Sequence, residues 1–559
     1  MIIELFGLPG SGKTTFARAW EREGARVVRA PGRWALILYN ALFIAENPLR
    51  AFRLLAGLFR EAPRGAKWLL FVNSFLVHNA KHVIARAVSA RGEIALLDQG
   101  HFQNVLSVFG KPPSEHTLRA YLPLLPKPDL LVVLDVPKTE RETRLASRGK
   151  IPRSELGNDA AAAAAFAAET DFPRVMSLIP EFGVYSRRIS GTSIPALNDI
   201  VTENLTYATA ARMPTEKAHG VSIAAMSDAF AAAGKRVLLL LPTRKNPITA
   251  EVHQYYDVPE SFGVERVSTP DYVGKGRTGA LFFFLQRLLF MRRLIVRPPP
   301  PGIVYTREPE LVWALSGRRI TVFEAHRVPR GLAGWLTAFL VRRARLVVCN
   351  SRGTEAAMRK LGVTRTVVAP NGFDPARFTG PVRFRSELGL PEGFLALYAG
   401  SEERWKGAHV FRDARRFAEG ISFAVVGGAN EGEEGGVSEI GRVHRADIGE
   451  YLRSADALVL PNTRESEESE RYTSPIKLFE YLAAGKPIVA SSLAPIREIL
   501  ADEDALFVSP GDAEALARAL GRLKEDPALH ARLARRSLAL SASYTWNARA
   551  KRILKALSL

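Results

Sequence analysis

A glycine-rich stretch near the start of the chain reads Gly7-Leu8-Pro9-Gly10-Ser11-Gly12-Lys13-Thr14 and fits the pattern G-x-x-x-x-G-K-[ST]. It follows the apolar run Ile2–Phe6 and precedes a helical pattern, which is the strand, loop and helix setting that this pattern requires. Glycines let the backbone curl so that successive N–H groups point at a β-phosphate, and the start of the following helix adds to the attraction. The stretch therefore predicts a P-loop that binds the phosphates of a nucleotide.

Within this loop, Lys13 is expected to bridge the β- and γ-phosphates, and Thr14 is expected to ligate Mg²⁺. The remaining expected nucleotide contacts in the loop are Gly7, Gly10, Ser11, Gly12 and Thr15.

Polar residues follow the next two apolar runs of this region. Asp98 ends Ile94–Leu97, and ligands of open α/β sheets gather at the carboxyl ends of strands, so Asp98 is predicted to hold Mg²⁺ or to act as a base toward an acceptor hydroxyl. Arg144 and Arg148 lie beyond the run Leu130–Leu134 and would clamp transferring phosphates, since a guanidinium matches phosphate oxygens bidentately. A solvated basic helix is the alternative for these arginines.

Apolar runs alternate with helical patterns along the whole chain. Their hydrophobicity is continuous, which is typical of parallel sheets buried on both faces, so we expect an α/β class throughout. The runs after the first 200 residues include Leu205–Ala210, Val237–Leu241, Ile303–Tyr305, Leu346–Cys349, Phe394–Tyr398, Phe423–Val426, Ala457–Leu460 and Ile488–Ala490.

At 559 residues the chain is too long for one hydrophobic core, because single cores stop growing at roughly 250–300 residues. A boundary is expected near Glu203, where a new α/β series begins, and another around Phe378 to Val382, among turn residues. The predicted domains are therefore 1–202, 203–380 and 381–559. The alanine run from Asp159 to Ala165 is predicted to be a plain helix.

The formal net charge of +20 favours anionic partners, namely phosphate-bearing substrates, acidic lipid headgroups or nucleic acid. Nucleic acid is disfavoured, because the sequence has no zinc-finger or RNA-recognition signature. The single Cys349 excludes an internal disulfide and fits a reducing compartment, and no signal peptide pattern is present, so we expect a cytoplasmic protein.

Two segments mix large apolar residues with arginines, at Arg33 to Arg64 and from Ala280 to Arg293. Each predicts either a helix in the interface of an anionic membrane or an ordinary amphipathic helix packed on its own domain. No apolar stretch reaches the roughly 18 uncharged residues that a membrane-spanning helix needs.

Over roughly the first 200 residues the chain resembles the thymidylate-kinase-like branch of the small-molecule P-loop kinases. The resemblance rests on the glycine-rich loop, on Asp98-Gln99-Gly100, on Leu134-Asp135-Val136-Pro137 and on the lid-like Arg144-Leu145-Ala146-Ser147-Arg148-Gly149. Gln99 stands where those kinases carry an arginine. The resemblance implies ATP or GTP binding and an ATP-dependent kinase activity toward a small molecule.

A second signature reads Thr473-Ser474-Pro475-Ile476-Lys477-Leu478-Phe479-Glu480 and continues through Tyr481-Leu482-Ala483-Ala484-Gly485-Lys486-Pro487-Ile488-Val489-Ala490. It is similar to the donor-binding signature of the family 4 retaining glycosyltransferases, whose GT-B fold pairs two Rossmann-like domains. The likeness extends from Leu205 to Leu559. It implies that Glu480 accepts hydrogen bonds from the ribose, and that Ser474, Pro475, Ile476, Lys477 and Leu478 present the helix start to the diphosphate.

Further residues of this half match the same family. Gly400, Ser401 and Lys406 resemble its phosphate clamp, with Ser401 in place of a frequent arginine and Arg404 as a substitute charge. His326 matches the histidine near the donor sugar, for which a structural role is the alternative, and Gly220 would let the donor approach the backbone.

The family often has a glutamate eight positions before Glu480, where this chain has Tyr472. No D-x-D pair or ligand cluster suggests a metal, so sugar transfer is predicted without a dedicated metal ion.

The leading interpretation is a bifunctional enzyme, a hexosyltransferase that moves a sugar from a nucleotide sugar to a polysaccharide, glycan or lipid-linked acceptor, joined to an ATP-dependent kinase. One alternative keeps the transferase and makes the P-loop domain purely regulatory. Another is a non-catalytic, membrane-associated assembly factor that only binds the donor.

Overall fold

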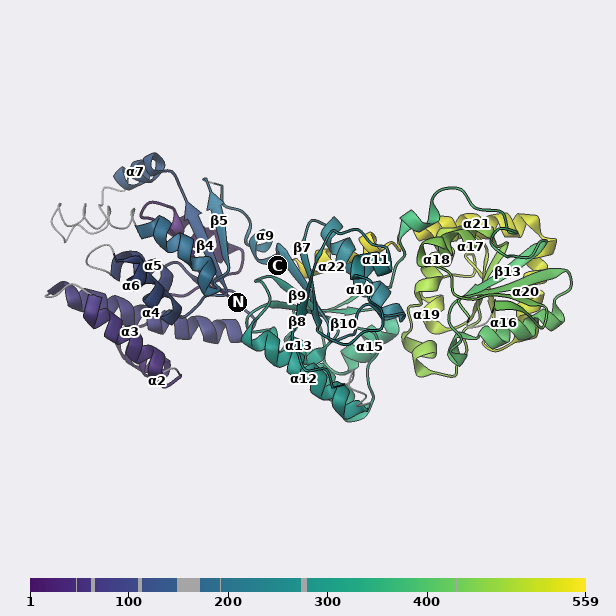
Figure 1. Cartoon of the computed structure of the whole chain (residues 1–559), viewed down its shortest axis with the longest axis horizontal. Coiled ribbons are helices and arrows are strands. Elements are labelled where there is room, and N and C mark those ends of the chain that lie inside the picture. Colours follow the sequence, from purple (N-terminus) through teal and green to yellow (C-terminus); the bar gives the residue numbers. More distant parts are fainter. Residues whose placement is uncertain are drawn as a thin grey trace.

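The computed structural model describes residues 1–46, 48–61, 66–108, 113–147, 171–191, 193–272, 279–428 and 431–558. In this part of the chain the elements gather into three lobes along the longest axis of the molecule (Figure 1). Each lobe contains one sheet with helices packed around it, which confirms the α/β class. The predicted alanine-rich helix and Arg148 lie outside the described residues.

The first lobe is built on a parallel sheet, whose described strands have the order β2-β3-β1-β4-β5. Strand β1 is central, since Ile3 pairs with Leu96 of β3 on one side and with Leu130 of β4 on the other. The elements are β1 Ile2–Phe6, α1 Lys13–Arg22, β2 Arg26–Val27, α2 Arg33–Glu46, α3 Pro48–Glu61, α4 Ala66–Ala90, β3 Ala95–Leu97, α5 His101–Val108, α6 Glu115–Tyr121, β4 Leu130–Asp135, α7 Lys138–Ala146, β5 Ser186–Ser190 and α9 Leu197–Thr202.

A buried ion pair joins the first lobe to the middle one. Asp129, just before β4, contacts Arg319 at 3.0 Å, and the two side chains are 6% and 1% exposed. Asp129 also accepts a hydrogen bond from the Ile2 N–H, while Arg319 donates to the Pro299 carbonyl. Because separating either partner would leave a buried charge unpaired, this contact holds the two lobes in one arrangement.

The middle lobe contains a second parallel sheet, in which the described strands run β12-β11-β10-β9-β6-β7-β8. Its elements are β6 Asn204–Ala208, α10 Ala218–Ala232, β7 Arg236–Pro242, α11 Val252–Tyr256, β8 Gly263–Val267, α12 Ala280–Val296, β9 Ile303–Thr306, α13 Pro309–Leu315, β10 Ile320–Ala325, α14 Gly331–Val341, β11 Leu346–Cys349, α15 Arg352–Lys360, β12 Thr366–Val368 and α22 Trp546–Leu557.

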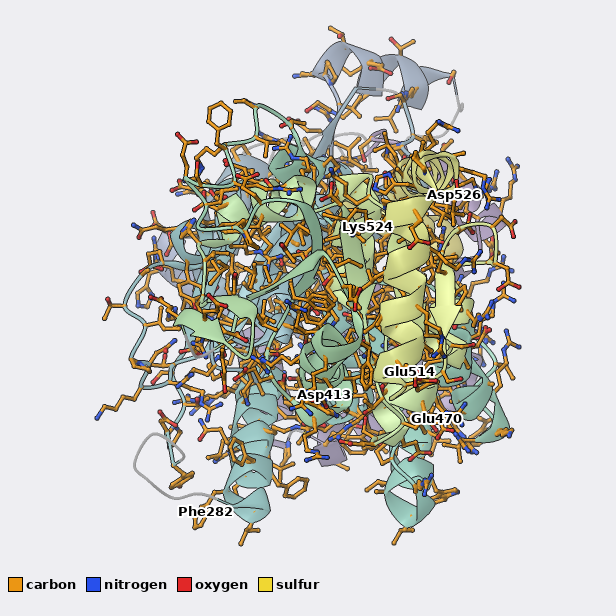
Figure 2. The ribbon with its side chains drawn as sticks, turned by 90° about the vertical axis from the view of Figure 1, so that its right-hand side faces the viewer. Phe282, Asp413, Glu470, Glu514, Lys524 and Asp526 are labelled. Carbon is orange, nitrogen blue, oxygen red and sulfur yellow. The ribbon has the colours of Figure 1, made fainter. Side chains whose placement is uncertain are left out.

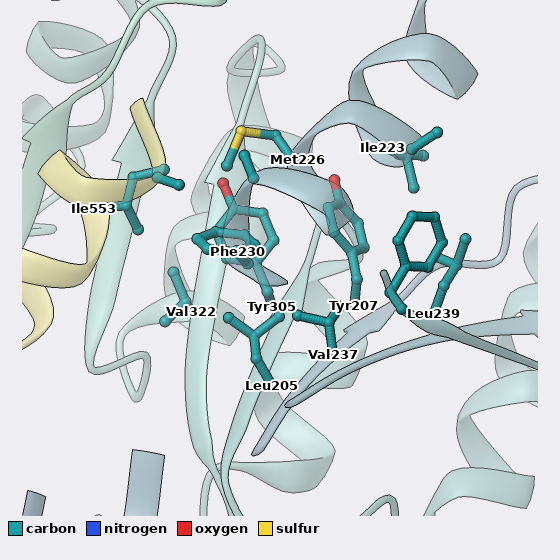
Figure 3. Packing of buried hydrophobic residues seen from close by; sticks show 14 of the residues in the cluster. Leu205, Tyr207, Ile223, Met226, Phe230, Val237, Leu239, Tyr305, Val322 and Ile553 are labelled. Atoms are coloured by element: carbon teal, nitrogen blue, oxygen red, sulfur yellow. The ribbon is translucent and has the colours of Figure 1, made fainter. Parts of the chain in front are cut away.

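The core under α10 is rich in aromatic rings (Figure 3). The Tyr305 ring lies 5.0 Å from that of Tyr207 and 5.2 Å from that of Phe230, and Ile553 of α22 closes the cluster. Tyrosines are placed here with their hydroxyl groups toward the carboxyl ends of the strands, where the Tyr207 hydroxyl donates to Glu324. A side chain of this core therefore also holds Glu324 in place by a hydrogen bond.

The third lobe has a mixed sheet, in which the described strands run β15-β16-β14-β13-β17-β18-β19. Strand β15 is antiparallel to β16, which corrects the expectation of purely parallel sheets: the hairpin turn between them allows direct reversal at the sheet edge. Figure 2 looks onto this lobe from its outer end. Its elements are β13 Phe394–Ala399, α16 Ala408–Ala414, β14 Ile421–Val426, β15 Glu431–Glu434, β16 Val437–Ile440, α17 Ile448–Ser454, β17 Ala457–Leu460, α18 Ile476–Ala484, β18 Ile488–Ser491, α19 Ala494–Arg497, β19 Leu506–Val508, α20 Ala513–Glu525 and α21 Pro527–Ser541.

The last helix, α22, returns to the middle lobe, where it appears in yellow among teal elements (Figure 1). Trp546 and Ile553 are buried in the core of that lobe, and Thr545 forms a bridge with Phe373. Among the described residues, no helix combines the length and the apolar character that crossing a bilayer requires.

Candidate functional site

The glycine-rich loop of the first lobe joins β1 to α1, as its sequence predicts. Gly10 has φ +81°, and a Cβ there would lie 2.7 Å from the Arg141 carbonyl oxygen, so only glycine fits this close approach. The Lys13 ammonium folds back over the loop and donates to the carbonyls of Gly7 at 2.6 Å and Leu8 at 3.1 Å. Burial lowers the pKa of Lys13 to about 8, so an incoming anion would favour its charged form.

A chain of two hydrogen bonds fixes the loop against α5. The Gly7 N–H donates to Gln103 Oε1 at 3.0 Å, and the Gln103 N–H donates to Glu4 Oε1 at 2.8 Å. Glu4 is buried in the middle of β1, and burial raises the pKa of its carboxyl to about 8. Gln103 of α5 and Glu4 of β1 thus hold the loop in place by hydrogen bonds.

The other predicted residues of this lobe differ in their contacts: Arg144 contacts the loop, whereas Asp98 is paired with a lysine of α4. Asp98 lies at the end of β3, where its Oδ1 accepts a 2.8 Å hydrogen bond from the Lys81 ammonium of α4. Arg144 reaches the loop, since its Nη1 lies 3.5 Å from the Gly10 carbonyl oxygen, and its Nη2 contacts Glu140 at 2.5 Å. Ser11 is buried, whereas Thr14 and Thr15 are exposed. Lys81 is a neighbour of Asp98 that the sequence pattern did not reveal.

A buried carboxylate organises the carboxyl ends of β9 and β10 in the middle lobe. Glu324 accepts hydrogen bonds from Arg307 at 3.1 Å, from Arg549 of α22 at 2.7 Å and from the Tyr207 hydroxyl at 3.0 Å, and its side chain is fully buried. Burial alone would raise the pKa of this carboxyl, but Arg307 and Arg549 outweigh it and hold the pKa well below its usual range. Glu324 is therefore ionised at neutral pH.

His326 is held by the same carboxylate, with its Nε2 3.0 Å from Glu324 Oε1. Burial lowers the pKa of His326, with Arg307 adding to the effect, so the ring is neutral at pH 7. His219, in the first turn of α10, is close enough for His326 and Arg307 to contribute to its lowered pKa of about 4, of which burial is the main cause. Gly220 follows it and packs against Tyr256.

The third lobe places Lys406 and Ser401 together after β13. The Lys406 ammonium donates to the Ser401 hydroxyl at 2.5 Å and contacts Glu403 at 2.8 Å. Gly407, directly after this lysine, has φ +77°, and a Cβ there would lie 1.8 Å from the Pro461 carbonyl oxygen. Arg404 differs from its prediction, because its side chain is 81% exposed and paired with Glu465 at 3.2 Å. The Arg404 guanidinium therefore contacts Glu465 and not the turn at Ser401.

The predicted donor segment begins just before α18. Ser474 accepts a 2.9 Å hydrogen bond from the Asn371 N–H through its hydroxyl, and its carbonyl accepts from the Asn371 amide group at 2.7 Å. Pro475, Ile476 and Leu478 form the N-cap and first turn of α18. This pair of bonds ties the start of α18 to the chain that leaves β12 of the middle lobe.

Glu480 lies one turn farther along α18, where its carboxylate is 3.5 Å from Arg445. Burial lowers the pKa of Arg445, and Glu480 partly offsets that effect. Tyr472 does not reproduce a carboxylate at its position, and its hydroxyl donates instead to Glu467 at 3.4 Å. In the part of the chain that the structure describes, no group of three or more His, Cys, Asp or Glu side chains is arranged to hold a metal ion.

Arginines were the main residues that sequence patterns missed. Arg307, Arg445 and Arg549 each touch a carboxylate of the candidate site. Of these three, only Arg307 could have been found from the sequence, because it ends an apolar run. Arg549 reaches Glu324 from a helix more than 200 residues away in sequence, so no local pattern marks it.

Comparison with known proteins supports the arrangement of the second and third lobes. Residues 219–377 match the model for Glycosyltransferase Family 4, and residues 393–526 match the model for Glycosyl transferases group 1. The second and third lobes therefore have a GT-B fold, and each contains a segment that matches a glycosyltransferase family.

Among curated proteins, this glycosyltransferase segment is 29% identical over 237 residues to a D-inositol 3-phosphate glycosyltransferase of Xylanimonas cellulosilytica, a match covering 37% of this chain and 55% of the relative. It is 31% identical over 214 residues to a phosphatidyl-myo-inositol mannosyltransferase of Mycolicibacterium smegmatis, which covers 35% of this chain and 53% of the relative. The chain spans about half the length of the curated relatives it matches.

Solved structures share the GT-B fold over most of these two lobes. Anabaena Alr3699/HepE, in complex with UDP, superposes with a TM-score of 0.50 at 19% identity and covers 64% of this chain and 99% of its own. A sucrose-phosphate synthase from Thermosynechococcus elongatus gives a TM-score of 0.51 at 17% identity, covering 63% of this chain and 97% of its own.

Replacing the buried carboxylate by an amide, Glu324→Gln, is expected to lower the free energy of unfolding at neutral pH by about 3–5 kcal/mol, because Arg307 and Arg549 lose their counter-charge. The loss is measured by denaturant unfolding. The control Glu310→Gln, whose partner Arg287 is partly exposed, is expected to lose much less.

The same variant tests the pKa of Glu324. A carboxyl with a depressed folded-state pKa stabilises the fold above its ordinary value of 4.5, and this contribution is lost as the pH falls below that value. The stability difference between the parent and Glu324→Gln should therefore shrink on acidification. A difference that stays constant down to pH 3 would show that the carboxyl is not ionised in the folded chain.

Proposed function

We propose that the second and third lobes transfer a sugar from a nucleotide-sugar donor, with residues 203–380 on the acceptor side and residues 381–559 on the donor side. The proposal rests on one observation: the two lobes that match glycosyltransferase families also bring the predicted donor-binding residues to one edge of a sheet. Lys406 and the start of α18 lie at the carboxyl edge of the donor-side sheet, and Glu480 follows on the same helix.

Each of these residues has a chemical task in the proposal. Lys406 neutralises the leaving nucleoside diphosphate, whose charge grows as the bond to the sugar breaks. Glu480, positioned by Arg445, accepts hydrogen bonds from ribose hydroxyls. His326, kept neutral and oriented by Glu324, lies at the acceptor-side strand ends and contacts the donor sugar. Gly220 and Gly400 let the ligand approach the backbone.

The acceptor class follows from the curated relatives, which act on inositol phosphate or phosphatidylinositol according to their names. A polyol or a lipid-linked glycan is therefore the proposed acceptor, with retention of the anomeric configuration. A protein that binds donor without turning it over is the alternative, favoured by Tyr472 in the place of a carboxylate.

The change Glu480→Ala should weaken binding of the cognate nucleotide sugar by about tenfold or more, because a charge-assisted hydrogen bond to the ribose is lost. Calorimetric titration of the full chain against a panel that begins with UDP-glucose measures the effect. Glu514→Ala, on the outer helix α20 (Figure 2), is the matched control and should bind normally. Equal binding by the two variants would refute the assignment of Glu480, and slow donor hydrolysis by the parent chain would dismiss the non-catalytic alternative.

We further propose that residues 1–202 form a P-loop domain that binds ATP or GTP and acts as a small-molecule kinase. Support comes from the strand, loop and helix arrangement, the close approach at Gly10 and the Lys13 ammonium curled over the loop. Mg²⁺ would be held by Thr14 and Asp98, whose hydroxyl and carboxylate oxygens suit this ion, although Lys81 competes for Asp98 Oδ1. Arg144, and Arg148 by sequence, would contact the phosphates.

The variant Lys13→Ala should abolish ATP binding in a filter or calorimetric assay, since it removes the cation that contacts the β- and γ-phosphates. Arg18→Ala, an exposed cation on the same helix, is the control and should bind ATP like the parent. Retained ATP binding by Lys13→Ala would overturn the P-loop proposal. If sugar transfer falls together with ATP binding, the domain is regulatory; if transfer is unchanged, the domains act independently.

A third proposal concerns an anionic membrane surface at the inner face of the cell membrane. The helices α12, α13 and α14 pack side by side along one edge of the middle lobe. They expose large apolar side chains beside the exposed cations Arg292, Arg293, Arg342 and Arg343. Helix α2 of the first lobe likewise exposes large apolar side chains beside an arginine, Arg33. The exposed apolar residues of these helices include Trp34, Ile37, Leu38, Leu281, Phe283, Phe284, Trp313, Leu332, Trp335, Leu336 and Phe339.

Such a surface suits peripheral contact, because apolar side chains enter the headgroup boundary while arginines meet acidic lipids. Sequence patterns pointed to α2 and α12, and the structure adds α14, where Trp335 stacks on Phe339 with ring centroids 5.7 Å apart. In Figure 1 α2 and α12 both project from the lower side of the molecule.

The double variant Leu332→Ser, Trp335→Ser should reduce binding to vesicles that contain phosphatidylglycerol by about tenfold or more, since each buried apolar side chain contributes roughly 1.5–3 kcal/mol. Co-sedimentation measures the bound fraction. Phe384→Ser, which changes an exposed aromatic residue of the third lobe, is the control. Unchanged sedimentation of the double variant, or equal binding of the parent to neutral vesicles, would contradict an anionic membrane as the partner.

A further inference from the structure

Lys477 has an unusual position in the first turn of α18. Its ammonium lies over the ring of Tyr398, 4.2 Å from the ring centroid, at the end of β13. The residue as a whole is half-buried, but its Nζ is buried and has no hydrogen-bond partner among the described residues. An ammonium has three donors and is strongly hydrated, so burying it without an acceptor costs several kcal/mol.

Burial and a neighbouring lysine disfavour the charge of this ammonium. The charge of Lys406 lowers the pKa of Lys477 and the charge of Glu403 raises it, but Glu403 is already bonded to Lys406 and Ser401. Burial, reinforced by Lys406, lowers the pKa of Lys477 well below its ordinary value. The site therefore holds two lysines whose charges a bound anion would stabilise together.

The geometry of the preceding turn shows where such an anion would lie. A Cβ built on Gly400 would lie 3.7 Å from Lys477 Nζ, so the ammonium borders the turn formed by Gly400 and Ser401. Ser401 brings no charge to this turn, and the Arg404 guanidinium is turned outward to Glu465. The Tyr481 hydroxyl accepts a 2.8 Å hydrogen bond from the Ala399 N–H, which fixes α18 against the end of β13.

We propose that Lys477 is the second cation of the diphosphate site, which pairs with Lys406 across the donor's pyrophosphate and provides the charge that Ser401 lacks. The start of α18 contributes its N–H groups to the same anion. The role rests on the proposed donor binding and adds one residue to it. Because the bound anion favours the charged ammonium, binding is accompanied by proton uptake at Lys477.

The test compares Lys477→Met with Lys524→Met, an exposed lysine of α20 in the same lobe, both in the Lys13→Ala background so that the glycine-rich loop contributes no binding. UDP, GDP, UMP and uridine are titrated calorimetrically into the full chain. Lys477→Met should weaken nucleoside diphosphate binding by about tenfold or more and leave uridine binding unchanged. Lys524→Met should behave like the parent.

Two further readouts separate this role from a structural one. Lys477→Met should melt at the same or a higher temperature, because an unsatisfied buried ammonium is removed. Titrations in buffers with different ionisation enthalpies should show proton uptake for the parent that is absent in Lys477→Met. Diphosphate affinity and proton uptake that are unchanged in Lys477→Met would overturn the role of Lys477 alone. A parent chain that binds none of the four probes would overturn the proposed donor binding as well.

Discussion

The middle lobe depends on one buried carboxylate. Glu324 receives Arg307 from the neighbouring strand, Arg549 from the final helix, the Tyr207 hydroxyl and the ring of His326. Without it, two buried guanidinium groups would lack a counter-charge, and α22 would lose its ion pair with the residues of this sheet. The same interaction also sets the orientation of His326 at the strand ends, so stability and the proposed sugar-transfer site depend on one group.

Much of the fold could be predicted because buried parallel strands have continuous apolar sequences. Leu346–Cys349 and Ala457–Leu460 were predicted with the bounds that the structure gives them. Edge strands were not predictable in this way. Strand β5 reads Ser-Arg-Arg-Ile-Ser and alternates between exposed and half-buried residues, and β15 consists of exposed glutamates and a glycine, so neither has an apolar run.

The candidate site was predictable where local backbone requirements leave a pattern, and not where distant side chains meet. The glycine-rich loop and the start of α18 have such patterns, since glycine and helix starts are local features. The pairs Lys81 with Asp98 and Arg445 with Glu480 join separate elements, and only the folded chain brings them together. Arg404 shows the converse, because proximity in sequence suggested a phosphate contact while the side chain pairs with Glu465 instead.

The central claim, that the third lobe binds the diphosphate of a sugar donor at the start of α18, is tested most directly by a crystal structure of the chain with a nucleoside diphosphate sugar. The account predicts the pyrophosphate between Lys406 and the first turn of α18, with the ribose on Glu480. A donor bound elsewhere, with Lys406 and Glu480 making no contact to it, would contradict the account.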